Sequence, residues 1–292
     1  MKFYLNLQRR SSGALLLLNS LSLDACFVAI SWQDLVARYL DVSLRWSELL
    51  LLFLVTWLAY AGDRLLDSFQ QPSQDAELPR HRFAARYRRP LGFLWSGLLV
   101  ITLIIAVLTV EPSSLIIAFW LGVGVVFYFA ICFFRPRLAR IIIPRELVVS
   151  GIFVTAAMFF PLCHIVQSVA FSEMLPAIFL LVGMLWLLAF LNCLGISCWE
   201  QQADQNSGEA TLATTFPLIC TYYPLLNIAL CCGLLILLFG YQTDWATKAL
   251  ISGVIASIVL LSCINYSKLP RNLKPVLADL SLMAPWTIYL LL

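Results

Sequence analysis

Residues 91–134 read LGFLWSGLLVITLIIAVLTVEPSSLIIAFWLGVGVVFYFAICFF, and this stretch decides the class of fold. It contains two apolar runs separated by Glu111 and Pro112. Each run is about 20 residues long, which is the length a helix needs to cross the hydrocarbon core of a bilayer. Two such runs joined by a tight, proline-containing turn predict a pair of antiparallel membrane helices.

The rest of the chain has the same character. Of its 292 residues, 61% are hydrophobic and 12% are charged, and the mean hydropathy is +0.89. Because a soluble globular chain carries roughly a quarter charged residues, this composition excludes disordered, fibrous and ordinary soluble proteins. The net charge of +3 is too balanced to suggest a nucleic-acid partner. We therefore predict an all-α, polytopic membrane protein with a single transmembrane domain over residues 1–292.

Nine segments are long and apolar enough to span a bilayer. The first follows a basic N-terminus and resembles a signal peptide. It contains Asn19 and Asp24 and lacks a clean cleavage site, so we interpret it as a retained membrane helix. The predicted nine-helix bundle has its spans at 13–37, 46–69, 91–110, 113–134, 146–165, 174–198, 216–240, 245–264 and 273–292.

The positions of the basic residues predict the orientation. With nine spans, 16 of the 19 lysines and arginines fall on one side, and only Arg38, Arg45 and Lys248 fall on the other. Because loops rich in Lys and Arg stay in the cytoplasm, we expect a bacterial inner-membrane protein with a cytoplasmic N-terminus and its C-terminus on the opposite side. The longest loops, 68–90 and 199–215, are then cytoplasmic, and we expect them to cap the functional site.

Two pairs of acidic residues close the second and sixth predicted spans on this cytoplasmic side. Asp63 and Asp67 are four residues apart, and so are Glu200 and Asp204, which places each pair on one face of a helix. A divalent cation would offset the repulsion within each pair, and Mg²⁺ commonly lies between carboxylates and a substrate phosphate. Alternatively, the acids are solvated helix ends whose counter-charges are Arg64 and neighbouring arginines.

The two acidic motifs resemble those of the UbiA superfamily of intramembrane prenyltransferases. That family has nine helices, with N-x-x-x-D-x-x-x-D at the end of the second and D-x-x-x-D followed by G-x-x-T-L after the sixth. Here residues 59–67 read AYAGDRLLD and residues 200–212 read EQQADQNSGEATL. Residues 277–285, LADLSLMAP, and the aromatic-then-basic stretch 128–135 are also similar to the family.

Two positions depart from the family pattern. Ala59 replaces the usual asparagine of the first motif, and Glu200 replaces the first aspartate of the second. Glutamate can still bind Mg²⁺ through a longer arm, whereas the loss of the asparagine removes a ligand or positioning group.

The resemblance implies Mg²⁺-dependent transfer of a polyprenyl group from its diphosphate to a small aromatic acceptor, as in quinone-type lipid biosynthesis. Asp63, Asp67, Glu200 and Asp204 would then be the catalytic metal ligands. A guanidinium can donate two parallel hydrogen bonds to phosphate oxygens. The candidates to face the diphosphate are therefore Arg64, Arg135 and Arg137. The expected prenyl and acceptor pocket contains Asn19, Asp24, Tyr60, Tyr128 and Asn192.

Three further interpretations stay open. The basic stretch from Arg80 to Arg89 either recruits the anionic substrate or binds lipid headgroups. Ala59 and Glu200 favour a non-catalytic relative that binds an isoprenoid lipid or a partner. The intramembrane acids Asp24 and Asp279 would suit a small ion-coupled transporter, but the sequence lacks the paired interruptions typical of inverted repeats.

Overall fold

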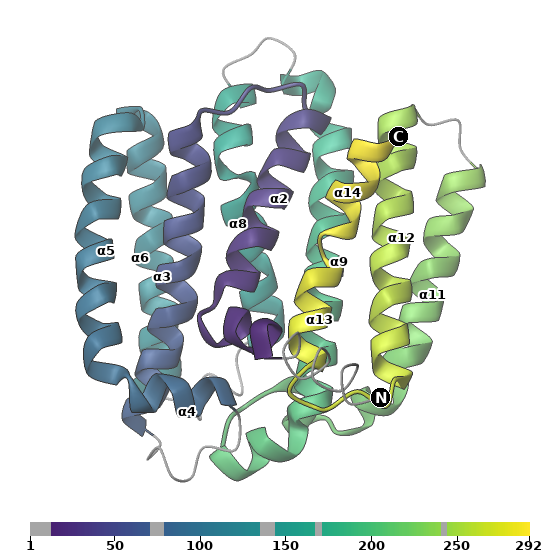
Figure 1. Cartoon of the computed structure of the whole chain (residues 1–292). Coiled ribbons are helices and arrows are strands. Elements are labelled where there is room, and N and C mark those ends of the chain that lie inside the picture. The colour runs from purple at the N-terminus through teal and green to yellow at the C-terminus, as the bar shows by residue number, and fades with distance from the viewer. Residues whose placement is uncertain (1–12, 71–78, 135–143, 167–170, 241–243) are drawn as a thin grey trace, which may run out of the picture.

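The structure is a computed structural model that describes residues 13–70, 79–134, 144–166, 171–240 and 244–292. Within these residues the secondary structure is entirely helical (Figure 1). The labelled helices are α2 (Leu23–Tyr39), α3 (Trp46–Gln70), α4 (Pro79–Arg86), α5 (Arg88–Thr109), α6 (Pro112–Phe134), α8 (Arg145–Val166), α9 (Phe171–Ser207), α10 (Leu212–Thr215), α11 (Leu218–Gly240), α12 (Trp245–Tyr266), α13 (Lys274–Ser281) and α14 (Ala284–Leu291).

Among the described residues, six helices are individually long and apolar enough to cross a membrane, namely α3, α5, α8, α9, α11 and α12. A seventh candidate is the helix Gly13–Ser20 taken together with α2, although the two are bent by 76°. The chain is therefore a multi-pass helical membrane protein, which confirms the predicted fold class at this level.

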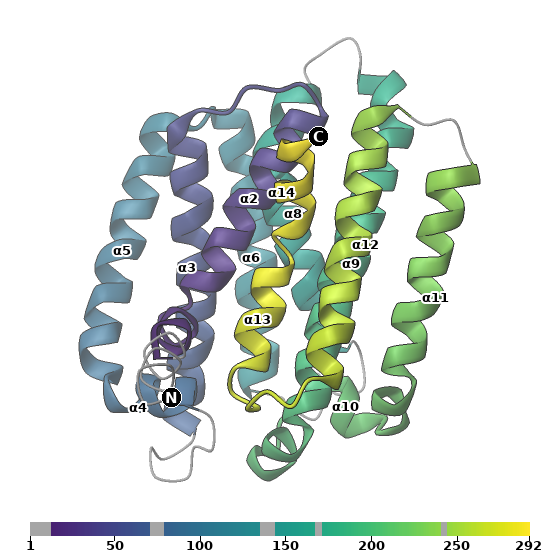
Figure 2. The same cartoon turned by 45° about the vertical axis from the view of Figure 1, so that its right-hand side comes forward.

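The last predicted span is not continuous. It consists of α13 and α14, which follow one another along the bundle with a break at Leu282 and Met283 (Figure 2). Pro285 lies in the first turn of α14 and cannot donate a backbone hydrogen bond. The Ser281 carbonyl, four residues before Pro285, instead accepts from the Ser257 hydroxyl of α12 at 2.7 Å. The next carbonyl, that of Leu282, accepts from the Trp32 indole at 2.6 Å, so side chains of α12 and α2 stabilise the break.

The first predicted span is also interrupted, at Leu21 and Ser22. Ser22 has a left-handed backbone with φ of 58°. The Leu21 carbonyl accepts from the Trp57 indole at 2.9 Å, and the Arg64 guanidinium donates to the Asn19 carbonyl. The Trp57 side chain therefore satisfies the Leu21 carbonyl at the break, and Arg64 adds a second donor to the Asn19 carbonyl, which also accepts from the Ser22 N–H at 2.9 Å.

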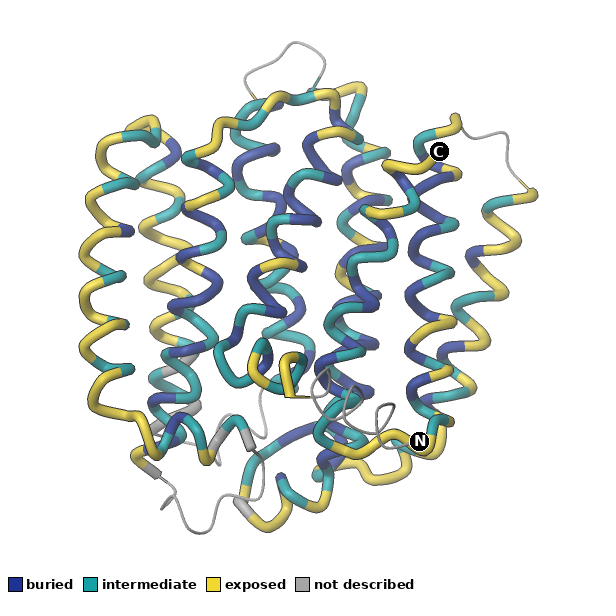
Figure 3. Tube along the Cα trace, in the orientation of Figure 1, coloured by how far each residue is buried: buried dark blue, intermediate teal, exposed yellow. Residues whose placement is uncertain are grey.

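The main core joins α2, α8, α9, α12, α13 and α14. Fully buried side chains such as Trp32, Leu188 and Leu250 fill it, and a smaller cluster around Trp57 joins α2, α3 and α5. The outer helices α5, α6 and α11 expose long apolar faces (Figure 3). Such long rows of exposed apolar side chains are typical of helix faces that contact lipid.

One end of the bundle carries α4 and α10, and we call it the α4 end. The C-terminal parts of α3 and α9 and the start of α8 lie at this end, whereas the C-terminus of the chain lies at the opposite end (Figure 1). The predicted loop 199–215 is largely helical instead, because α9 continues to Ser207 and α10 follows after a short turn. Residues 71–78 of the other predicted loop lie outside the described residues.

Candidate functional site

The two acidic pairs both lie at the α4 end. Asp63 and Asp67 are in the last two turns of α3, and Glu200 and Asp204 are in the last two turns of α9. Glu200 and Asp204 are buried, with 5% and 7% exposure, whereas Asp63 and Asp67 are partly exposed. Buried carboxylates require hydrogen-bond donors or positive charges nearby, and here arginine side chains provide them.

Arg145, the first residue of α8, connects the first motif to the second. Its Nη2 donates to Asp63 Oδ2 at 3.1 Å and its Nη1 donates to Glu209 Oε2 at 2.8 Å. Asp67 and Tyr128 also lie within electrostatic reach of this guanidinium. Arg145 therefore joins α3 and α8 to the turn between α9 and α10.

Arg80, in the first turn of α4, binds Glu200 in a two-pronged ion pair. Its Nη1 donates to Glu200 Oε1 at 2.7 Å, and its Nη2 donates to Oε2. Burial by itself lowers the pKa of Arg80, but the neighbouring carboxylates of Glu200, Glu209 and Asp204 raise that pKa overall above its ordinary value. The guanidinium thus keeps its positive charge although α4 and α9 enclose it.

A tight turn positions Glu209. Gly208, with φ of 76°, ends α9 in the left-handed conformation that glycine adopts at no steric cost. Thr211 then caps α10 by accepting from the Thr214 N–H at 3.2 Å, and buried Glu146 accepts from the Leu212 N–H at 2.8 Å. The G-x-x-T-L tail of the motif therefore builds the turn that directs Glu209 toward Arg145.

This arrangement does not fit a resident Mg²⁺ ion. Among the described residues, no three Asp, Glu, His or Cys side chains converge on a position that could hold a metal. Asp63 and Glu200 instead accept hydrogen bonds from Arg145 and Arg80. Counter-charges from Arg64 and neighbouring arginines were the alternative interpretation of the acidic pairs, and the arginines that bind Asp63 and Glu200 are Arg145 and Arg80.

Of the three residues expected to face the diphosphate, the structure describes only Arg64. Arg64 extends inward from α3 to the Asn19 carbonyl and lies near Asp24, Asp63 and Asp279. Arg135 and Arg137 fall outside the described residues. Among the described residues, the arginines that form ion pairs with the acidic pairs are Arg80 and Arg145.

Four of the five residues expected in the pocket gather deeper in the bundle. Asn19 donates to Asp24 Oδ2 at 2.7 Å, and Asn192 donates to Asp279 Oδ1 at 2.7 Å. Tyr60 lies within electrostatic reach of both acids. Tyr128, the fifth residue, lies near Arg145 instead.

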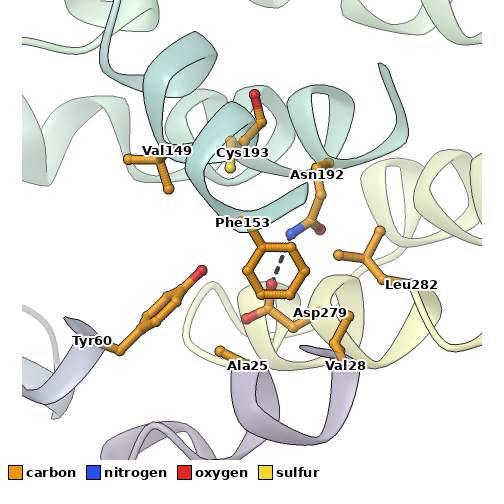
Figure 4. Close-up of a pocket in the computed structure, with 11 residues that line it drawn as sticks. Ala25, Val28, Tyr60, Val149, Phe153, Asn192, Cys193, Asp279 and Leu282 are labelled. Carbon is orange, nitrogen blue, oxygen red and sulfur yellow. Dashed lines mark hydrogen bonds between the residues drawn. The ribbon is translucent and has the colours of Figure 1, made fainter. Parts of the chain in front are cut away.

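A small cavity opens beside this polar group (Figure 4). Its space for water-sized molecules amounts to about one water molecule, so a whole isoprenoid chain does not fit inside it. Its lining comes from α2, α3, α8, α9 and α13 and the break after α13, and consists of Ala25, Val28, Tyr60, Val149, Ser150, Phe153, Ala189, Asn192, Cys193, Asp279 and Leu282.

Sequence reasoning assigned no site role to Arg145, Glu146 or Glu209. The signal for the first two is a charged pair directly after Pro144, at the start of an apolar helix. Charged residues at such a boundary usually mark only the membrane interface. Glu209 lies inside the second motif, but its role depends on the turn at Gly208, which the motif does not specify on its own.

Comparison of the chain with protein-family models, with curated proteins and with solved structures finds no match.

Proposed function

We propose that the protein is an intramembrane prenyltransferase, which moves a polyprenyl group from its diphosphate to a small aromatic acceptor, as the resemblance to the UbiA superfamily implies. The observation that carries this proposal is the meeting of Asp63 from α3 and Glu200 from α9 with Arg145 and Arg80 at one end of the bundle. Two carboxylate pairs and two guanidinium groups at the membrane boundary suit an ionic headgroup whose tail is apolar.

The arginines suit the charge that develops in the reaction. When an allylic C–O bond ionises, the departing diphosphate gains negative charge, and preorganised cations stabilise that charge. The Arg80 guanidinium already donates two hydrogen bonds to one planar carboxylate, that of Glu200. The same two N–H groups can donate to two phosphate oxygens. We propose that the diphosphate arrives as its Mg²⁺ complex and displaces the carboxylates from Arg80 and Arg145. The released Asp63 carboxylate would then hold the metal that the substrate brings.

The proposal includes all nine predicted spans, with the α4 end in the cytoplasm. In support, the C-terminus lies at the end opposite α4, as an odd number of crossings requires (Figure 1). The prenyl tail would then lie among the apolar helices, in contact with lipid.

The experiment is equilibrium binding of geranyl S-thiolodiphosphate to the purified protein in lipid nanodiscs, with Mg²⁺ and with EDTA. We expect Mg²⁺-dependent binding that Asp63→Asn and Arg145→Met each weaken at least tenfold, since each loses a charge-assisted contact. Arg38→Met is the matched control, because Arg38 pairs with Asp34 at 2.7 Å in the last turn of α2, and α2 ends opposite α4 (Figure 1). A folded protein that binds no analogue in either condition would contradict the proposal.

A non-catalytic lipid-binding role is the second candidate. Ala59 in the first motif and the arginine pairing of Asp63 and Glu200 favour it, because both features leave a metal with fewer ligands. The analogue would then bind equally well with EDTA, and no acceptor would give prenyl transfer.

An ion-coupled transporter is the third candidate, and the two interrupted helices favour it. Asp24 lies just after the break before α2, and Asp279 lies just before the break after α13. Broken helices that carry acids are typical of transporters. Proton flux into liposomes that disappears in Asp279→Asn would identify this function, and absence of flux would exclude it.

A further inference from the structure

A cluster of exposed arginines lies where α4 meets α5. Arg86 is the last residue of α4, Arg88 and Arg89 are the first two residues of α5, and all three are exposed. Residues 79–110 contain five arginines and no aspartate or glutamate. Among the described residues, no acidic side chain forms an ion pair with Arg86, Arg88 or Arg89. We call these three residues the arginine corner, and its positive charge is available to an anionic partner.

The arginine corner lies at the level where the membrane helices end. α4 runs across the ends of the spans rather than along them (Figure 1). Along α5, apolar side chains are exposed from Phe93 onward, and Phe93 itself is 82% exposed (Figure 3). Arg89 is four residues before Phe93 and shares a helix face with it, and exposed Val100 and Val107 continue that face. The corner is therefore at the end of a row of side chains that faces lipid.

The first turn of α5 is an unfavourable place for cations. The positive end of the helix dipole lies there, and Arg88 and Arg89 add two further positive charges. Tyr87, which precedes the helix, makes no side-chain hydrogen bond that would cap it. These arginines therefore do not stabilise α5 by themselves, and a negative group beside them would offset their repulsion.

An exposed tyrosine accompanies the arginines. The Tyr87 ring is 5.0 Å from the Phe83 ring between their centroids, and the Arg86 guanidinium lies 5.9 Å from the Tyr87 centroid. Tyrosine is enriched at the boundary between hydrocarbon and water, where its ring and its hydroxyl group meet different surroundings. The aromatic and basic side chains together are typical of the headgroup layer of a bilayer.

We propose that the arginine corner binds the headgroup layer of the surrounding membrane, and that its occupant is a phospholipid with a net negative headgroup. Guanidinium groups donate to the phosphodiester oxygens. A zwitterionic headgroup carries its own cation, which weakens the attraction to a basic cluster. The inference does not depend on the proposed function, because it rests on the charge, exposure and position of the corner.

Two features favour a membrane lipid over a soluble phosphate or the proposed diphosphate substrate. The exposed apolar face that begins at Phe93 can contact the acyl chains of a lipid whose phosphate lies at the corner. The acidic pairs, in contrast, meet Arg80, whose side chain is 19% exposed and donates to Glu200 at 2.7 Å. The enclosed charges at the acidic pairs and the exposed charges of the corner thus suit different ligands.

The test is native mass spectrometry of the purified full chain in detergent. The protein is titrated with phosphatidylglycerol, which is anionic, or with phosphatidylcholine of the same acyl chains, which is zwitterionic. The measured quantity is the ratio of the two dissociation constants for the first bound lipid. We expect the wild-type protein to bind phosphatidylglycerol at least tenfold more tightly, because each basic residue near an anionic headgroup contributes about fivefold.

Three double variants locate this preference on the surface. Arg86→Gln/Arg89→Gln should reduce it to about threefold or less, whereas Arg86→Lys/Arg89→Lys keeps both charges and should retain most of it. Arg38→Gln/Lys248→Gln is the matched control, since it also removes two exposed charges but at the end opposite α4 (Figure 1). It should change the preference less than twofold. All three variants should unfold at the wild-type temperature, because the substituted side chains are exposed.

The outcomes that would overturn the proposal are specific. Equal affinity of the wild-type protein for both lipids would do so, as would an undiminished preference in folded Arg86→Gln/Arg89→Gln. An equal loss in the control variant would show a general charge effect instead of a local surface. Displacement of phosphatidylglycerol by an equal concentration of sn-glycerol 3-phosphate would assign the corner to soluble phosphate esters, and displacement by geranyl S-thiolodiphosphate would assign it to recruitment of the substrate.

Discussion

Arg145 carries a disproportionate share of the contacts at the α4 end. It is a single side chain that binds two carboxylates from different parts of the chain, Asp63 and Glu209. Lysine could not take over this geometry, because its ammonium lacks the planar fork of a guanidinium.

Removal of the Arg145 charge should therefore lower stability. We expect Arg145→Met to reduce the free energy of unfolding by roughly 1–3 kcal/mol, since it leaves two partly buried carboxylates without a partner. Thermal unfolding in detergent measures the change. The double variant Arg145→Met/Asp63→Asn should recover part of the loss, and a double variant less stable than the single one would contradict this explanation.

Residue types and spacing predicted the acidic pairs but not their partners. The i, i+4 spacing fixes Asp63 and Asp67 on one face whatever the tertiary structure. The pairing of Glu200 with Arg80 spans 120 positions in the chain, and no local pattern encodes it. For the same reason, Arg64 was expected beside the acidic pairs, whereas the bend at Leu21 and Ser22 brings the Asn19 carbonyl to it.

At the scale of helices, the uninterrupted spans were the easiest to predict. A continuous apolar run of sufficient length specifies α3, α5, α8, α9, α11 and α12 on its own. The breaks in the first and last spans depend on side chains of other helices, namely Trp57 and Arg64 for the first and Trp32 for the last. A hydropathy profile does not include contacts between helices. Both spans were therefore predicted to be continuous.

The contact between α12 and α14 should be sensitive to one methyl group. A side chain at Gly253 would collide with the backbone of Pro285. We expect Gly253→Ala to destabilise the protein by about 1–3 kcal/mol, because an overpacked core forces the backbone to shift. Gly233→Ala in α11 is the matched control, since nothing lies within 4 Å of the added carbon. It should be neutral or slightly stabilising, and equal unfolding temperatures for the two variants would contradict the prediction.

At the scale of the whole molecule, a second ion-pair cluster lies at the end opposite α4. Buried Glu48 accepts from Arg45 at 2.8 Å and lies 3.0 Å from His164 Nε2, which joins the start of α3 to the end of α8. The two ends of these helices are thus held by separate sets of charges.

Glu48→Ala should therefore affect stability without affecting the site. We expect a loss of roughly 1–2 kcal/mol, a moderate value because Arg45 and His164 are partly exposed and can be solvated. Binding of geranyl S-thiolodiphosphate should change less than twofold. A change in affinity as large as that of Asp63→Asn would show that the two ends are coupled.

The orientation of the bundle also gives a direct prediction. With a cytoplasmic α4 end, the C-terminus after α14 lies on the far side of the membrane. Alkaline phosphatase fused after Leu292 should be active in bacteria, and a fluorescent protein fused there should stay dark. The reverse pattern would place the acidic pairs on the far side.

Finally, α9 determines how far apart two chemical groups can lie. Asn192 and Glu200 belong to the same 37-residue helix, eight residues apart, which corresponds to an axial rise of about 12 Å. The helix therefore fixes the distance between the cavity and the charged α4 end. One residue inserted between these positions would rotate Glu200 by about 100° relative to Asn192. The intervening stretch can change in composition, but it cannot change in length without moving one of the two groups off its partner.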